Sequence, residues 1–316
     1  MRHNASLLGP AWNSAYLLLT ITAMSWAGNI IVGRVAREFV PPMALSFWRW
    51  LVALLLLLPF AWPHIRKDWP VLRRQWPMLV MFGSLGAGTF SALLYYGLQY
   101  TTALNVSVLN AAQAAMILAM GMLIFRDSAS RSQIVGVLLS LVGVLAIVSK
   151  GDAALLLGLR LNIGDALVLL GGLNWAVYAV FLRKRPAVHP LSFFAAILVV
   201  GLMVVAPLYL HELSRGRRIV QTPESWLCLA FVAIFPSLVA QMFFNRGVEL
   251  IGAARASQFL NLSPALGALF SILLLGERFG LYHLVGMVLV GAGILLSERR
   301  PPSQRAPRQR FREHDS

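Results

Sequence analysis

Long apolar runs alternate with short segments that contain charge, proline or glycine along most of this chain. The runs lie at about residues 12–33, 42–62, 76–98, 103–125, 133–149, 163–182, 191–210, 225–245, 254–275 and 281–297. Most approach the roughly 20 residues that a helix needs to cross a bilayer, and they lack the period-two alternation of barrel strands. The pattern predicts an all-α polytopic membrane protein with ten transmembrane helices.

The composition excludes a soluble domain and limits the chemistry. Of 316 residues, 58% are hydrophobic and 12% are charged, whereas soluble domains are about 25% charged. Cys228 is the single cysteine, the six histidines are scattered, and no phosphate-binding loop accompanies the few lysines. We therefore expect no disulfide, no metal, no cofactor and no ATP hydrolysis.

Basic residues outnumber acidic residues by 27 to 12, and their positions predict an orientation. With the N-terminus in the cytoplasm, the cytoplasmic segments hold 18 of them and the opposite segments hold 8. This asymmetry predicts a bacterial inner-membrane protein with both termini cytoplasmic, so its partner is the lipid bilayer and not nucleic acid. Residues 298–316 are expected to form a basic, disordered cytoplasmic tail.

The two halves of the chain resemble each other. A shift of 150 aligns Ala103 with Ala253 and Gly143 with Gly293, and a shift of 149 aligns Trp26 with Trp175. We expect a first repeat at 12–149, a connecting loop at 150–162 and a second repeat at 163–297, each with five helices. An odd number of helices inserts the second repeat upside down, so the fold class is two inverted five-helix repeats.

Several motifs carry a resemblance to a known family. They are Phe47-Trp48-Arg49-Trp50-Leu51, Ala253-Ala254-Arg255-Ala256-Ser257, Leu262-Ser263-Pro264 and Leu273-Leu274-Leu275-Gly276-Glu277-Arg278. With the ten spans, they resemble the EamA proteins of the drug/metabolite transporter superfamily. The resemblance implies a cavity lined by helices 1, 3, 4, 6, 8 and 9, and export of amino acids or other small metabolites. Ala114 stands where the second repeat has Pro264, so helix 4 is expected to lack the break of helix 9.

Polar and aromatic side chains inside the spans are candidates for a substrate site, because polar groups in hydrocarbon are costly. The paired Trp26 and Trp175 could stack over an apolar or cationic substrate while nearby amides supply donors and acceptors. Interfacial anchoring and helix packing are the alternatives. The predicted substrate-binding residues are Trp26, Asn29, Tyr95, Asn110, Gln113, Asn174, Trp175, Tyr178, Gln241, Asn245 and Asn261.

Two charged residues receive a gate or structural role. Arg49 is the basic residue within a span, and we favour an anchor or gate over a site for a substrate carboxylate. Asp165 begins helix 6, where a carboxylate caps the helix. Because no acidic residue falls at mid-span, facilitation or exchange is favoured over proton coupling.

Two alternatives stay open. His64 and Asp68 share a helical face, as an acid–base pair of an intramembrane enzyme would. Among carriers, a drug or another metabolite is the other substrate class. Glycines in helices 5 and 10 indicate packing within the bundle, and a homodimer face is the second interpretation of them.

Overall fold

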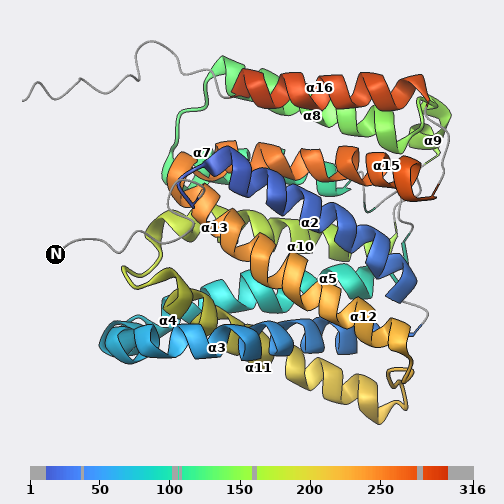
Figure 1. The fold of residues 1–316 in the computed structure, drawn as a ribbon. Coiled ribbons are helices and arrows are strands. Elements are labelled where there is room, and N and C mark those ends of the chain that lie inside the picture. The colour runs from blue at the N-terminus through green and yellow to red at the C-terminus, as the bar shows by residue number, and fades with distance from the viewer. Residues whose placement is uncertain are drawn as a thin grey trace, which may run out of the picture.

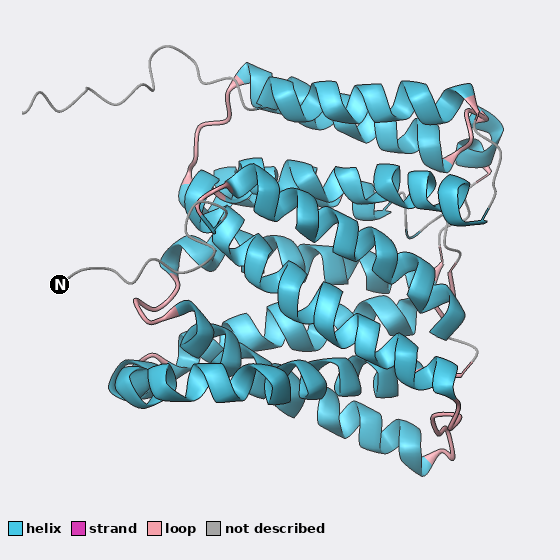
Figure 2. Ribbon diagram, viewed as in Figure 1, coloured by secondary structure: helices cyan, strands magenta, loops and turns pink. Residues whose placement is uncertain are grey.

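The computed structural model describes residues 12–36, 39–101, 106, 109–158, 162–275 and 280–297. In this part of the chain the regular structure is helical, and the helices lie side by side in one bundle (Figures 1 and 2). The predicted tail 298–316 and the residues Gly276, Glu277 and Arg278 lie outside the described residues.

Each predicted span corresponds to a helix or to a chain of joined helical segments. The first half contains α2 (Ala15–Ala36), α3 (Pro42–Arg74), α4 (Trp76–Gly83) continued by η1 (Ser84–Thr89) and α5 (Phe90–Gly97), α7 (Gln113–Phe125) and α8 (Arg131–Val148). The second half contains α10 (Ile163–Phe181), η2 (Leu182–Lys184), α11 (Pro190–Ser214), α12 (Pro223–Val232) continued by η3 (Ala233–Val239) and α13 (Ala240–Ile251), α14 (Ala253–Ala256) continued by η4 (Ser257–Asn261) and α15 (Leu262–Leu275), and α16 (Leu281–Ser297). The short helix α9 (Ala153–Leu157) lies between the halves.

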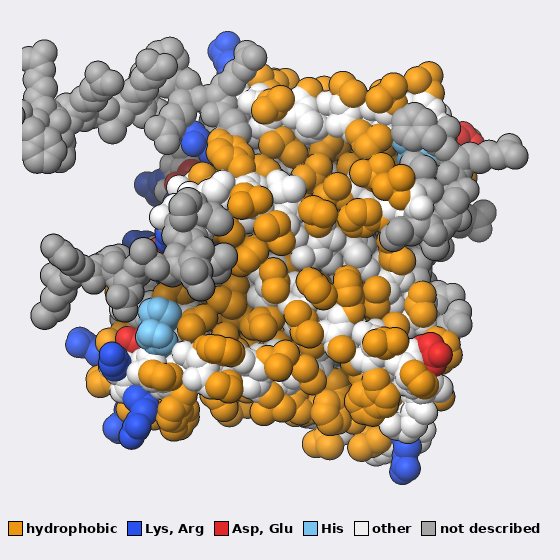
Figure 3. All heavy atoms as spheres, viewed as in Figure 1, with side chains coloured by type: hydrophobic (Ala, Val, Ile, Leu, Met, Phe, Trp, Pro, Cys, Tyr) orange, Lys and Arg blue, Asp and Glu red, His pale blue; other side chains and the backbone are white. Residues whose placement is uncertain are grey.

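The helices match the dimensions of a bilayer. Seven helices among the described residues are long and apolar enough to cross it, and Leu109–Phe125 and Leu281–Ser297 are shorter apolar helices. Hydrophobic side chains cover most of the face in Figure 3, and Lys and Arg atoms gather mainly at its left edge. An apolar belt between charged ends is the surface that a lipid bilayer requires.

Two helices are longer than the spans predicted from the apolar runs. Helix α3 continues from 62 to Arg74, and α11 continues from 210 to Ser214. The apolar run measures the thickness of hydrocarbon, whereas a helix continues into water when its backbone and charges allow it. Arg73 and Arg74 in the last turn of α3 favour this extension, because cations complement the negative end of the helix dipole.

The packing follows the inverted repeat. Helix α10 packs against α5 and α7, and the equivalent helix of the first half, α2, packs against α13 and α15. The equivalent helices α3 and α11 pack on each other, as do α8 and α16. A pseudo-two-fold axis therefore relates the five-helix halves.

Helix 4 shows only a local change of pitch at Ala112 within Leu109–Phe125. Residues Leu109 to Ala111 are helical, Ala112 forms a turn, and α7 then begins at Gln113. The amide of Ala112 donates to the carbonyl oxygen of Leu109, three residues back, at 3.1 Å. Proline is not needed for this change of pitch, and Pro264 itself lies in the first turn of α15, where helices tolerate it.

Helices α8 and α16 pack closely at the upper edge of the bundle in Figure 1. A Cβ atom on Gly143 would lie 2.7 Å from the carbonyl oxygen of Gly286, and one on Gly136 would lie 2.5 Å from that of Gly293. These glycines are therefore used for packing within one chain. Gly291 differs, because a Cβ atom there would meet nothing within 4 Å.

We expect Gly143→Ala to lower the free energy of unfolding by about 1–3 kcal/mol, the usual cost of overpacking. The matched control is Gly291→Ala in α16, which has open space and gains the higher helix propensity of alanine. Thermal unfolding of the purified protein in detergent measures both. Equal melting temperatures of the two variants would contradict the role of Gly143.

Candidate functional site

A cavity of about 140 Å³ lies inside the bundle, between the two repeats. Its walls come from helices 1, 2, 3, 4, 6, 8 and 9. The lining residues are Trp26, Asn29, Arg49, Trp50, Gly86, Phe90, Ser91, Leu94, Asn110, Gln113, Trp175, Gln241, Leu260, Ser263 and Pro264. Seven residues predicted from the sequence thus meet here, six from the predicted substrate set together with Arg49.

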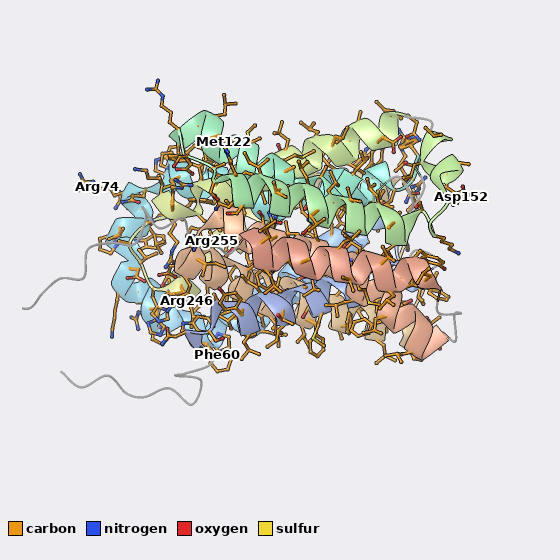
Figure 4. The ribbon with its side chains drawn as sticks, turned by 90° about the horizontal axis from the view of Figure 1, so that it is seen from above. Phe60, Arg74, Met122, Asp152, Arg246 and Arg255 are labelled. Carbon is orange, nitrogen blue, oxygen red and sulfur yellow. The ribbon has the colours of Figure 1, made fainter. Side chains whose placement is uncertain are left out.

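The cavity lies away from one end of the molecule. Figure 4 shows Arg74, Arg246 and Arg255 at one end, which we call the arginine-rich end, and Asp152 at the opposite end. Helix α2 starts beside Arg246, which donates to the side chain of Asn13 at 2.8 Å. Trp26 lies at the middle of α2, and Trp175 lies near the middle of α10. The cavity is therefore central along the bundle, separated from the arginine-rich end by several helical turns.

The paired tryptophans contact each other directly. The ring centroids of Trp26 and Trp175 are 5.5 Å apart with an interplanar angle of 80°. This edge-to-face contact leaves no space for a ligand between the rings, so the two indoles form one aromatic wall. Their N–H groups differ: Trp26 Nε1 donates to the carbonyl oxygen of Pro236 at 3.1 Å, and Trp175 Nε1 is buried without a partner among the described residues.

Two predicted substrate residues lie beneath the cavity wall. Tyr178 is fully buried, and its hydroxyl donates to Asn245 Oδ1 at 2.7 Å and accepts from Gln241 Nε2 at 3.0 Å. This network ties α10 to α13. Further toward the arginine-rich end, Glu249 pairs with Arg185 at 3.0 Å and with Arg246 at 3.1 Å.

Four other predicted residues also lie outside the lining. Tyr95 accepts from Arg49, and Asn174 Nδ2 donates to Thr89 Oγ1 at 3.0 Å. Asn261 is 1% exposed in η4, and neither polar atom of its side chain has a partner among the described residues. Asp165 forms a capping box with Asn162, whose backbone N–H donates to Asp165 Oδ2 at 2.7 Å.

Arg49 connects three segments at the edge of the cavity. Its Nε donates to Ser237 Oγ at 2.7 Å, and its Nη1 donates to Tyr95 Oη at 2.6 Å. Its Cζ lies 4.6 Å from the ring centroid of Trp50. Helix α3 is thereby joined to α5 and to η3, so Arg49 anchors helices and faces the cavity at once.

Two π-helical segments occupy equivalent positions in the repeats, η1 in helix 3 and η3 in helix 8. In each, a hydroxyl donates to the carbonyl oxygen five residues earlier, Thr89 to Ser84 at 2.8 Å and Ser237 to Val232 at 2.6 Å. Such segments are frequent at functional sites. The run of Gly86 and Gly88, and Pro236 within helix 8, are the sequence signals that could have indicated them.

Sequence reasoning also missed a buried acid. Glu212, 7% exposed near the end of α11, accepts the backbone N–H of Ala44 at 2.8 Å. It caps the start of α3, because the carboxylate complements the positive end of that helix. No local pattern reveals this role, since the acid and the capped helix are 168 residues apart.

His64 and Asp68 do not form an acid–base pair with each other. The ring of His64 stacks on that of His189, with centroids 3.6 Å apart and an angle of 5°. Asp68 Oδ2 accepts the backbone N–H of His189 at 2.9 Å. Both side chains therefore attach α3 to the start of α11. Among the described residues, no group of three His, Cys, Asp or Glu could hold a metal ion.

The architecture and the central cavity define a polytopic membrane protein with two inverted repeats. A family model described as the EamA-like transporter family matches residues 13–149 and 162–299. The chain belongs to this family, and its role is transport of small molecules across a bilayer.

Relatives agree with this assignment. The "Uncharacterized transporter YyaM" of Bacillus subtilis is 25% identical over 89% of this chain and 92% of its own. An "Uncharacterized transporter" of Archaeoglobus fulgidus is 26% identical, covering 90% and 97%. The "Probable amino-acid metabolite efflux pump" of Salmonella typhimurium is 24% identical, covering 89% and 93%. A crystal structure with 15% identity has a TM-score of 0.74 over 90% of this chain and 96% of that one, which shows a shared fold.

The stacked histidines predict a loss of stability in acid. Partial burial and the neighbouring His64 hold the pKa of His189 below its ordinary value of 6.5, with Arg185 adding to the effect and Asp68 opposing it. The folded state therefore binds this proton less readily than the unfolded state, so stability is present above pH 6.5 and falls as the pH decreases below it.

We expect His189→Asn, which keeps a helix-capping side chain, to flatten the decline of melting temperature between about pH 7 and 5. The control is His211→Asn, at an exposed position near the end of the same helix. A variant that follows the wild-type pH profile would rule out this role of His189.

Proposed function

We propose that this chain is a secondary transporter that exports amino acids or related small metabolites by alternating access, without ATP hydrolysis. The observation that carries the proposal is the cavity between the two repeats, with Trp26 and Trp175 in contact at its wall. Two halves related by a pseudo-two-fold axis allow two packings of similar energy, each open to one side. The same cavity then faces the two sides in turn.

The contacts support a state that is closed at the arginine-rich end. Below the cavity, Tyr178 packs against Trp175 with ring centroids 5.1 Å apart and bonds to Gln241 and Asn245. Closer to the arginine-rich end, Glu249 forms ion pairs with Arg185 and Arg246. A substrate moving from the cavity toward that end has to separate α10 from α13.

The name of the Salmonella relative supports amino acids or their metabolites as substrates. The lining supports a small organic molecule, since amide, hydroxyl and indole groups alternate with Phe90, Leu94 and Leu260. A drug or another metabolite is the second candidate, favoured by this apolar part of the wall. We propose no enzymatic activity, because His64 and Asp68 both serve the contact between α3 and α11.

Among the described residues, no acidic side chain lines the cavity. Proton-coupled carriers place a carboxylate or histidine on the transport path. We therefore propose downhill facilitation or exchange. Asp165, the acid nearest the start of helix 6, accepts the hydroxyl of Thr101 and the amide of Asn162 and acts as a cap.

Orientation follows from charge. We propose that the arginine-rich end faces the cytoplasm, because cytoplasmic segments carry the excess of Lys and Arg. Both termini are then cytoplasmic, and Asp152 faces the opposite side (Figure 4).

Cysteine labelling tests the orientation. Cys228 is the single cysteine and is buried, so Cys228→Ser provides a background for Arg74→Cys and Asp152→Cys. In intact cells we expect a membrane-impermeant maleimide to label the cysteine at 152 and to label that at 74 only after permeabilisation. The reverse pattern would place the arginine-rich end outside.

Substrate flux tests the function. In proteoliposomes without a pH gradient, we expect wild type to release loaded amino acids, and Trp26→Ala combined with Trp175→Ala to slow release by about tenfold or more, equal to about 1.4 kcal/mol or more. Trp69→Ala is the control, since this residue is 58% exposed. Flux that requires a pH gradient would contradict facilitation, and full flux in the double variant would remove the cavity from the path.

A further inference from the structure

The charge of Arg49 has no counter-ion among the described residues. The side chain is buried, 7% exposed, and both of its hydrogen-bond partners are neutral hydroxyls, those of Ser237 and Tyr95. Among the described residues, the arginines that form ion pairs are Arg183, Arg185 and Arg246. A buried charge without an opposite charge is unfavourable, and an anion in the cavity would relieve that cost.

Arg49 retains a donor for such an anion. Its hydrogen bonds use Nε and Nη1, which leaves Nη2 without a partner among the described residues. Arginine stays charged at all physiological pH values, and its N–H groups suit carboxylate oxygens. Because Arg49 lines the cavity, a ligand inside the cavity can reach this donor.

Three residues of the cavity wall carry polar atoms that are buried behind its surface. Trp175 Nε1, Ser263 Oγ and Asn29 Oδ1 are buried without partners among the described residues, and all three residues line it. The indole N–H and the hydroxyl can donate to an anionic oxygen. Buried polar groups are normally paired. A ligand could pair these groups after a small movement of the wall, whereas Arg49 already borders the cavity.

We propose that Arg49 is the anion-binding residue of the cavity, and that the ligand is an organic monoanion with one carboxylate on an apolar or aromatic body. This proposal rests on the proposed function and defines its substrate class. Trp50, Phe90 and Leu94 provide the wall for the body. Within the described part of the chain, Arg49 is the one arginine in the lining, which does not match a dianion such as a phosphate ester, and no carboxylate lines the cavity to attract a cation. The ammonium group of an amino acid is thus dispensable, whereas its carboxylate is required.

Four ligands with one phenethyl body separate these charges. They are 3-phenylpropionate, phenylalanine, 3-phenylpropanamide and phenethylamine, which carry a carboxylate, a zwitterion, a neutral amide and a cation. Binding to the purified wild type is measured by quenching of tryptophan fluorescence. We expect 3-phenylpropionate and phenylalanine to bind about tenfold or more tightly than the amide, and the amine to bind weakest.

The substitution Arg49→Gln should remove the preference for carboxylate over amide, and Arg49→Lys should retain part of it. The control is Arg131→Gln, at an exposed position at the start of α8, which should keep the wild-type ratio. Equal binding of all four ligands, strongest binding of the amine, no binding of any ligand, or an unchanged ratio in Arg49→Gln would each overturn the proposal. The wild-type series decides the question even if Arg49→Gln does not fold.

Flux of the same ligands separates this proposal from the proposed function. Release of the amide or the amine from proteoliposomes, at rates independent of Arg49, would leave a transporter whose ligand is not an anion. Carboxylate-selective binding without flux of any ligand would instead leave the anion site in place and refute transport.

Discussion

Every polar group that this chain carries into the hydrocarbon needs a partner inside the protein, because lipid offers none. The structure meets this demand both within helices and between them. Hydroxyls of Thr89 and Ser237 bond to backbone carbonyls in the two π-helical segments, and Asn174 donates to Thr89. The exceptions then become informative. Of the buried polar side chains that lack partners in the described part of the chain, those of Asn29, Trp175 and Ser263 line one cavity.

The two repeats differ in how they satisfy the indole N–H of their equivalent tryptophans. Trp26 and Trp175 hold equivalent positions, and one indole N–H is satisfied by Pro236 while the other is unpaired. The repeats differ in sequence around the two rings, for example with Pro236 in helix 8 where helix 3 has Gly86. The contact between the two rings lies at the point where the halves meet, which makes it sensitive to their relative position.

Periodicity and the repeat were sufficient to predict the membrane class, the ten helices and the paired tryptophans. The sequence also indicated Asn110, Gln113 and Gln241, which line the cavity because each lies on the inner face of its helix. It could not separate residues that face the cavity from residues one turn deeper. Tyr178 and Asn245 share a helical face with lining residues and lie beneath the wall. Contacts between distant segments, such as Glu212 with the start of α3, have no local signature.

The contacts proposed to close the arginine-rich end are weak enough to be broken in a transport cycle. Glu249 serves both Arg185 and Arg246, and its side chain is 40% exposed. Partly exposed ion pairs contribute about 0–1 kcal/mol each, so packing of Trp175, Tyr178 and Phe244 supplies more of the closure. A carrier needs its two states within a few kcal/mol of each other, since a ligand shifts the balance only by its difference in affinity for them. Under the proposed function, a ligand at Arg49 shares the cavity with Trp26 and Trp175, and the weak ion pairs of Glu249 do not prevent an exchange of states.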